Sequence, residues 1–140
     1  MNALVVDASV WVAAADAGDH SWELSRSFLT AAAARDTTIV VPAFAEVEIA
    51  CALARRTRDS QMGRKLSSDI LQSLVHEVRE TDSANIRRSV TVGTDRILRG
   101  GDALYAALAD SAGAQLVSWD KELVSRANAI TPEMWLEKHG

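Results

Sequence analysis

Three short apolar segments constrain the fold of this chain more than any other feature of its sequence. They lie at residues 3–6, 38–41 and 115–118, and each is continuously apolar or rich in β-branched residues. Such runs are typical of parallel strands that are covered on both faces. A weaker strand is expected at residues 74–79, and a fifth near residues 129–130.

The segments between these strands have helical patterns. We expect helices over residues 9–17, 21–34, 43–58, 60–73, 83–98, 103–112 and 121–127. Two of them carry apolar side chains at helical spacing, which predicts that those side chains face the core. They are Met62, Leu66, Ile70 and Leu74 in one helix, and Ile86, Val90 and Ile97 in the other. Strands that alternate with helices indicate an α/β fold built on a parallel sheet.

Length and composition fit one such domain. The chain has 140 residues, of which 48% are apolar and 24% are charged, as expected for a single globular domain spanning residues 1–140. No apolar run approaches the ~20 residues of a membrane span, and the start carries no basic segment before its short apolar stretch. These features predict a cytoplasmic protein with no membrane partner.

The composition also excludes several kinds of site. A single cysteine, Cys51, excludes an internal disulfide framework and a cysteine-based zinc site, and the histidines are too scattered for a His-rich metal site. The formal net charge of −4 argues mildly against nucleic acid as a partner, because phosphate contacts favour basic proteins. That argument weakens if acidic side chains are gathered in one place and neutralised by a bound cation.

Four acidic side chains are placed for such a gathering. In open parallel sheets, ligands bind beyond the carboxyl ends of the strands. Asp7 directly follows the first predicted strand, and Asp120 closely follows the strand at residues 115–118. Asp102 lies at the start of an apolar helix, and Glu48 lies in the helix after the second strand. These four carboxylates, from four separate elements, can converge on one point.

A cluster of carboxylates is self-repelling unless a cation holds it. Hard oxygen ligands suit Mg²⁺, for which Mn²⁺ can substitute, and such a centre beside a phosphodiester activates a water molecule for hydrolysis. The pattern therefore favours a metal-dependent phosphodiesterase. Each acid also has a purely structural interpretation, because the aspartates fit helix N-caps and Glu48 fits a solvated helix face.

Four segments of the chain carry a family resemblance. They are VVDASVWVAA, VPAFAEVEIACALARRTRD, LRGGDALYAALAD and LVSWDKEL, in this order and with family-like spacing. With them the chain resembles the PIN-domain family and, within it, the VapC-type ribonuclease toxins of type II toxin–antitoxin pairs. The resemblance implies a three-layer α/β/α sandwich around a mostly parallel sheet of about five strands. It also implies a Mg²⁺- or Mn²⁺-dependent endoribonuclease that hydrolyses RNA phosphodiester bonds.

The resemblance assigns the acids of the site. The first, third and fourth acids fall on Asp7, Asp102 and Asp120, and the second is Glu48 or, alternatively, Glu46. Asp7 and Asp102 are expected to bind the metal directly, and Asp120 and Glu48 directly or through water. The two glutamates cannot both face the metal, because positions two apart on a helix point about 200° away from each other. Family spacing favours Glu48.

Other residues have supporting assignments. Ser9 and Ser118 match small hydroxyl positions that orient a water or a carboxylate. Arg55 and Arg56 are candidates for RNA contacts, because a substrate backbone near an acidic site needs neighbouring positive charge.

The resemblance implies protein partners as well. A small VapB-like antitoxin would hold the enzyme inactive by placing a basic side chain in the acidic site. Homodimerisation is also implied, with Trp11 or Trp22 as contacts. Two other functions stay open. One is a PIN-fold RNA-binding or scaffold module with little or no catalysis, and the other is a phosphotransfer or receiver-like protein with an acidic pocket.

Overall fold

Four parallel strands form the central sheet of the structure, a computed structural model that describes residues 2–139. They are β1 (Asn2–Val6), β2 (Thr37–Pro42), β3 (Glu77–Arg79) and β4 (Gln115–Val117), in the spatial order β3-β2-β1-β4. Every neighbouring pair is parallel, and Leu4 of β1 lies opposite both Ile39 and Gln115. The predicted α/β class with a parallel sheet is confirmed.

The strand expected near residues 129–130 is reduced to a single bridge. Ile130 pairs in parallel with Val117, and its N–H donates to the Leu116 carbonyl at 3.0 Å. The Ser118 N–H in turn donates to the Ile130 carbonyl at 2.9 Å. Within residues 2–139 the sheet therefore has four strands rather than five, and this bridge fixes the chain just after β4.

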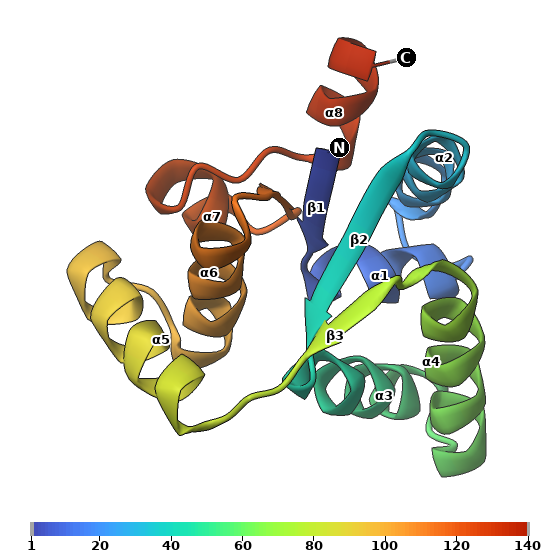
Figure 1. Cartoon of the computed structure of the whole chain (residues 1–140). Helices are drawn as coiled ribbons and strands as arrows, with labels where there is room; N and C mark the ends of the chain where they lie inside the picture. Colours follow the sequence, from blue (N-terminus) through green and yellow to red (C-terminus); the bar gives the residue numbers. More distant parts are fainter. Residues whose placement is uncertain (1, 140) are drawn as a thin grey trace.

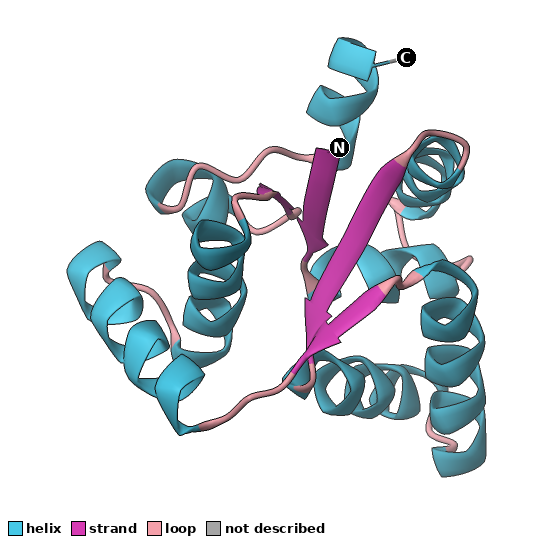
Figure 2. Cartoon of the chain, viewed as in Figure 1, coloured by secondary structure: helices cyan, strands magenta, loops and turns pink. Residues whose placement is uncertain are grey.

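Helices cover both faces of the sheet and give three layers (Figures 1 and 2). On one side lie α5 (Ser83–Arg96), α6 (Gly100–Ala112) and α7 (Lys121–Arg126). On the other side lie α1 (Ala8–Ala15), α2 (Trp22–Ala33), α3 (Phe44–Thr57) and α4 (Ser60–Leu74). In the described part of the chain, no helix combines the length and apolar character that a membrane span requires.

The core lies between the sheet and its first layer of helices. Val5, Val6 and Ile39 of the strands are fully buried, as is Tyr105 of α6. Trp11 is also fully buried and donates from its indole N–H to the Val6 carbonyl at 2.9 Å. The expectation that Trp11 contacts a second subunit is therefore wrong, because the side chain fills the core.

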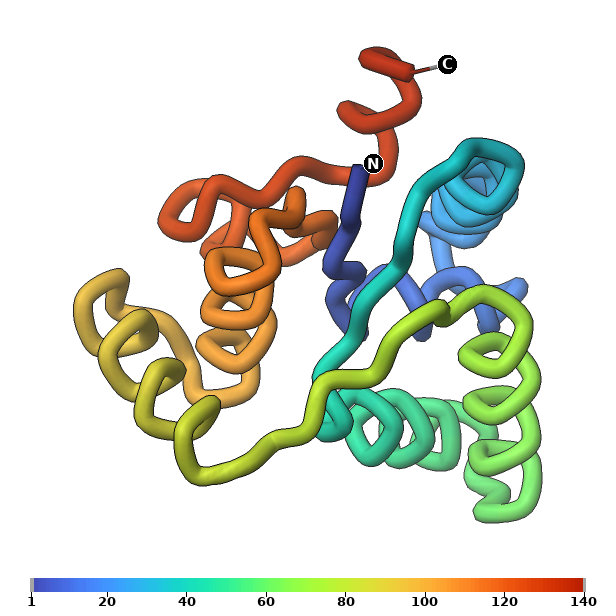
Figure 3. Tube along the Cα trace, viewed as in Figure 1, coloured from blue at the N-terminus to red at the C-terminus, as the bar shows by residue number. Residues whose placement is uncertain are grey.

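The helix over residues 83–98 was expected to turn its branched side chains inward, and it does the opposite. Ile86, Val90 and Ile97 are exposed, whereas the buried residues of α5 are the small Ser89 and Gly93. A Cβ on Gly93 would lie 2.6 Å from the Cβ of Ala103, so the two helices are in close contact there. The reason is that α6 separates α5 from the sheet (Figure 3), and small residues allow this close outer packing.

Two other helices refine the predictions. In α4, Leu66, Ile70 and Leu74 pack against the core as expected, but Met62 at the start of the helix is exposed. An additional helix, α8 (Pro132–His139), was missed, although Pro132 suits a first helical turn. It packs on α2 through Trp135, whose ring meets Phe28 edge-on with centroids 5.1 Å apart.

Candidate active site

Asp7 is a buried carboxylate at the carboxyl end of β1. Its side chain is 4% exposed, and it is the N-cap of α1. The Oδ2 atom accepts hydrogen bonds from the Ser9 hydroxyl at 2.7 Å, the Ser9 N–H at 3.2 Å and the Ser118 hydroxyl at 2.8 Å. All these donors are neutral, so Asp7 is held in place without being neutralised.

The two serines join the ends of β1 and β4 into one polar network. The Ser9 hydroxyl accepts from the Trp119 N–H at 3.0 Å, and the Ser118 hydroxyl accepts from the Asp120 N–H at 2.9 Å. The two hydroxyls lie 3.3 Å apart. Both therefore couple the position of Asp7 to the turn that carries Asp120.

Glu48 reaches the same edge of the sheet from α3. It is half-buried, and its Oε1 atom accepts from the Tyr105 hydroxyl at 2.8 Å. A Cβ on Gly101 would lie 3.4 Å from Oε2, so the start of α6 flanks the other carboxylate oxygen. Glu46 is exposed and lines a separate surface pocket with Leu71. Only Glu48 of the two glutamates thus faces the other acids.

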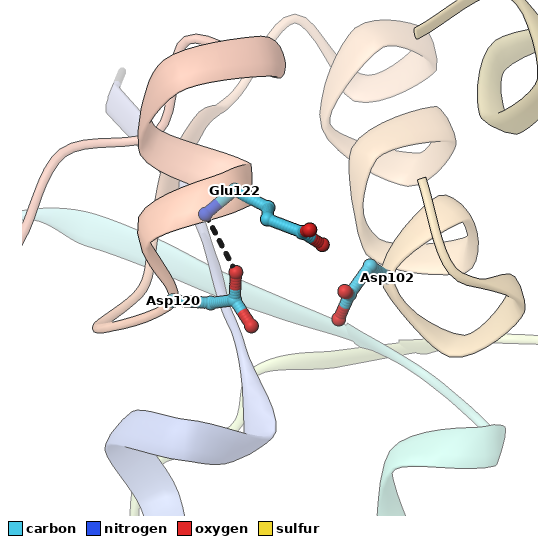
Figure 4. Close-up of side chains that lie close together, drawn as sticks. All are labelled: Asp102, Asp120 and Glu122. Atoms are coloured by element: carbon cyan, nitrogen blue, oxygen red, sulfur yellow. Dashed lines mark hydrogen bonds between the residues drawn. The ribbon is translucent and has the colours of Figure 1, made fainter. Parts of the chain in front are cut away.

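Three further acids meet where α6 and α7 begin. Asp102, Asp120 and Glu122 each offer a carboxylate oxygen, and these oxygens lie within 4.8 Å of one another. Figure 4 shows Asp120 and Glu122 at the start of α7 facing Asp102 on α6. Asp120 is the N-cap of α7, and its Oδ1 accepts from the Glu122 N–H at 2.8 Å.

Arg99 supplies the positive charge of this group. Its Nε donates to Asp102 at 3.1 Å and lies 3.6 Å from a Glu122 oxygen. Its terminal guanidinium nitrogen Nη2 donates to Asp120. The Arg99 side chain is nevertheless 68% exposed. Because ions in solvent easily replace an exposed guanidinium, Arg99 balances the charge of the three acids without blocking access to them.

The acids of the cluster raise one another's pKa in three cases, in addition to the effect of burial. Burial raises the pKa of Asp7, although the serine hydrogen bonds oppose the shift. Burial also raises the pKa of Glu48; the Tyr105 hydrogen bond opposes it, and the charges of Asp7 and Asp102 add to it. The pKa of Asp102 is raised by burial and then by the charges of Asp120 and Asp7. Each of these carboxylates is thus destabilised as an anion.

The structure therefore brings together Asp7, Glu48, Asp102 and Asp120 at one sheet edge. For Asp7 and Asp120, the N-cap interpretation and the clustered one are both true, since one carboxylate does both. Asp102 is different: it lies within the first turn of α6, where Arg99 is the N-cap.

The two candidate RNA-contacting arginines differ in their surroundings. Arg56 is held by Asp16 and Asp19, with N–O distances of 2.8 and 2.9 Å. Arg55 is exposed and lines an open surface hollow beside Arg58. Of the two, Arg55 is the one left available to a phosphate.

Three residues of this site were missed in the sequence. Glu122 follows Asp120 by two positions, and Arg99 and Tyr105 each stand three positions from Asp102. The spacing of three places Arg99 and Tyr105 near Asp102 on α6 and is the signal that could have found them. Nothing in the sequence alone shows that Tyr105 meets Glu48, because these residues are 57 positions apart.

Comparison with solved structures shows a shared fold. VapC20 from Mycobacterium tuberculosis, described as a toxin that cleaves the sarcin-ricin loop, is 17% identical, with a TM-score of 0.73 over 87% of this chain and 93% of its own. PAE2754 from Pyrobaculum aerophilum is 24% identical, with a TM-score of 0.71 over 98% and 88%. A chain of VapBC2 from Rickettsia felis, bound to a DNA fragment from the promoter, is 15% identical, with a TM-score of 0.70 over 92% and 96%.

Comparison at the level of sequence identifies the family. A search of curated proteins gives no significant match. The sequence model of the PIN domain, however, matches residues 4–129, which is most of the chain and includes all four acids. The chain therefore belongs to the PIN domain family.

Proposed function

We propose that this protein is a divalent-cation-dependent endoribonuclease that acts as the toxin of a toxin–antitoxin pair. The observation that carries the proposal is the convergence of Asp7, Glu48, Asp102 and Asp120 from four elements at the carboxyl end of the sheet. Burial and the negative charges of the cluster raise the pKa values of Asp7, Glu48 and Asp102, a repulsive arrangement that a bound cation would relieve. Membership of the PIN domain family and the fold shared with VapC20 support the same function.

The residues present fit a divalent cation. The donors are all carboxylate oxygens, which suit Mg²⁺ and, as a substitute, Mn²⁺. Asp7 and Asp102 would bind the ion directly, and Asp120 and Glu48 directly or through water. Ser9 and Ser118 would hold Asp7 from behind with neutral hydrogen bonds, leaving its charge for the cation. The bound ion would supply activation of water and charge stabilisation at the phosphate.

The side chains have distinct tasks in this scheme. The Asp7 carboxylate keeps one orientation because three donors fix its Oδ2 atom. Glu48 and Asp120 would orient the attacking water for in-line attack on phosphorus, which leaves a 5′-phosphate and a 3′-hydroxyl. Arg99 is exposed at the rim of the cluster, and Arg55 lies free on the surface of α3. Both would offset the repulsion between the acids and an RNA backbone.

A nuclease that cuts RNA of its own cell needs an inhibitor. We propose a VapB-like antitoxin as that partner, in line with the fold shared with VapBC2, and a cytoplasmic homodimer as the active form. With Trp11 in the core, Trp22 is the remaining tryptophan suggested for a dimer contact. Trp22 is partly exposed, and the Arg26 guanidinium stacks 5.5 Å from its ring centre.

Cleavage of total RNA tests the enzymatic proposal. Wild-type protein with Mg²⁺ or Mn²⁺ should cut RNA, and EDTA or Asp7→Asn should stop it. Asp110→Asn is the matched control, because Asp110 also lies on α6 but pairs with Arg96 on the far outer side. Cleavage that survives both EDTA and Asp7→Asn would contradict the proposal. RNA binding without any cleavage would support the scaffold function instead.

Growth of a bacterial host tests the toxin proposal. Expression of the wild-type chain alone should arrest growth, and co-expression of its VapB-like antitoxin should restore it. Normal growth with abundant folded wild-type protein would argue strongly against a toxin.

A further inference from the structure

Tyr105 is a buried side chain that contacts the acidic cluster from α6. Its ring is fully buried, and its hydroxyl donates to Glu48 Oε1 at 2.8 Å. Burial raises the pKa of this hydroxyl, and the charges of Glu48 and Asp7 add to the shift. The hydroxyl thus binds Glu48 of α3 and lies near enough to Asp7 for its charge to act on it.

We propose that Tyr105 is a positioning residue, which holds the Glu48 carboxylate in the orientation that completes the cation site. This inference rests on the proposed function and assigns to that site a residue beyond its acids. Tyr105 itself does not touch the substrate or the cation. It acts through Glu48.

The start of α6 shows how the arrangement is built. Asp102 and Tyr105 are three positions apart and therefore lie on the same face of the helix. Gly101 flanks the second Glu48 oxygen, since a Cβ there would lie in ordinary contact with Oε2, at 3.4 Å. Tyr105 occupies one Glu48 oxygen, and the other stays on the side of Asp102, where a cation can reach it.

Charge explains why Glu48 needs such a restraint. Its carboxylate lies half-buried among like charges, and the charges of Asp7 and Asp102 raise its pKa. A flexible glutamate in that position would lower its energy by turning toward solvent. A neutral hydroxyl opposes this movement and leaves the negative charge intact for a cation, which a lysine or arginine in the same place would not do.

Removal of the hydroxyl tests the proposal directly. Mn²⁺ binding, measured by calorimetry, should weaken about tenfold to a hundredfold in Tyr105→Phe, the usual cost of losing an outer partner of a metal ligand. In Glu48→Gln the same second change should have little further effect, because Tyr105 acts through the carboxylate. Thr57→Val is the control, because it removes a hydroxyl from α3, the helix of Glu48, that donates to the Leu53 carbonyl at 2.8 Å instead of to an acid.

A second measurement does not depend on a Tyr105 variant. Tyr105 is the only tyrosine in the chain, so its ring resonances are unambiguous in an isotope-labelled sample. Mg²⁺ should shift these resonances in wild type with the midpoint of a calorimetric titration with Mg²⁺, and much less in Glu48→Gln. Equal Mn²⁺ affinity in wild type and Tyr105→Phe, or a tyrosine signal indifferent to Mg²⁺ in a protein that binds it, would overturn the positioning role. A wild type that binds neither ion would instead refute the proposed function itself.

Discussion

The acidic cluster has two halves that are built differently. In the inner half, Asp7 and Glu48 are held by the neutral hydroxyls of Ser9, Ser118 and Tyr105. In the outer half, Asp102, Asp120 and Glu122 surround the exposed guanidinium of Arg99. The carboxylates of the inner half are fixed in orientation, but no positive side chain balances their charge. In the outer half the exposed Arg99 side chain balances the charge and can be displaced.

The difference between the two halves shows how a cluster of acids can fold without a bound cation. Neutral donors set the orientation of buried carboxylates at little electrostatic gain, so the inner anions carry a free-energy cost that a bound cation would relieve. Arg99 lowers the repulsion of the outer acids in the meantime. Since the Arg99 side chain is exposed, its ion pairs with the three acids contribute little to stability, and the guanidinium is easily displaced.

Loss of the inner anchor should have the largest effect. Asp7→Asn keeps the shape and can still accept from Ser9 and Ser118, but it removes the charge that the cation needs. Cleavage should fall by far more than the roughly hundredfold typical of losing an outer partner. Initial rates at saturating Mg²⁺ measure it. Near-normal rates would mean that the outer half alone carries the cation.

The two glutamates of α3 separate the inner half from its surroundings. Glu48→Gln should lower cleavage by orders of magnitude, because Glu48 faces Tyr105 and the other acids. Glu46→Gln should stay near wild type, because Glu46 is exposed in a different pocket. Cleavage rates of both variants at saturating Mg²⁺ test this expectation. The reverse ranking would identify Glu46, and not Glu48, as the second acid of the site.

Arg99→Gln tests the outer half and should act in the opposite direction on binding. Without the guanidinium, a divalent cation has no competitor for Asp102 and Asp120, so its affinity should rise by about twofold to tenfold at low salt. The gain should shrink as ionic strength increases, because exposed charges are screened. Calorimetry at two salt concentrations measures both effects. Arg126→Gln is the control, as it also pairs with Glu122 but with neither aspartate. Weaker cation binding in Arg99→Gln would show that the arginine organises the acids rather than competing for them.

Stability against pH should give the smallest change. Asp7, Glu48 and Asp102 have pKa values raised above those of the unfolded chain, so the folded state binds more protons between the two values. Unfolding free energy must then decrease as pH rises through that window. Asp16 and Asp19 have lowered pKa values, and their contribution is lost only at pH below the ordinary aspartate range. The metal-free protein should therefore melt at a lower temperature at pH ~7.5 than at a pH just above the ordinary carboxylate pKa range, near pH ~5.

Calorimetric melting with and without Mg²⁺ checks this expectation. Saturating Mg²⁺ should remove most of the difference, because the cation replaces the proton. Metal-free Asp102→Asn should melt at or above the wild type at neutral pH. A clearly lower melting temperature would show that the favourable position of Asp102 in the first turn of α6 outweighs its repulsion from the other acids.

Much of the fold could be predicted because it follows from local pattern. The strands β1, β2 and β4 coincide with short segments that are apolar or rich in β-branched residues, and Asp7 and Asp120 could be placed at the sheet edge because each follows such a segment. The inward stripe expected for Ile86, Val90 and Ile97 failed for a reason outside the helix itself. An amphipathic pattern shows which side chains are apolar, but it does not show whether a second helix already covers the sheet.

The sequence by itself determined that this is a parallel α/β protein and which carboxylates end its strands, because hydrophobic periodicity and strand-end position are local properties. Only the tertiary structure decided which side chains complete the site. Tyr105 reaches Glu48 across 57 positions, and Ser118 reaches Asp7 across 111, because neighbouring elements in space are distant in the chain. It also decided that Arg99 sits among three acids, one of them its near neighbour and two from α7 and its N-cap. Contacts of this kind depend on how helices pack on the sheet, and no local pattern encodes them.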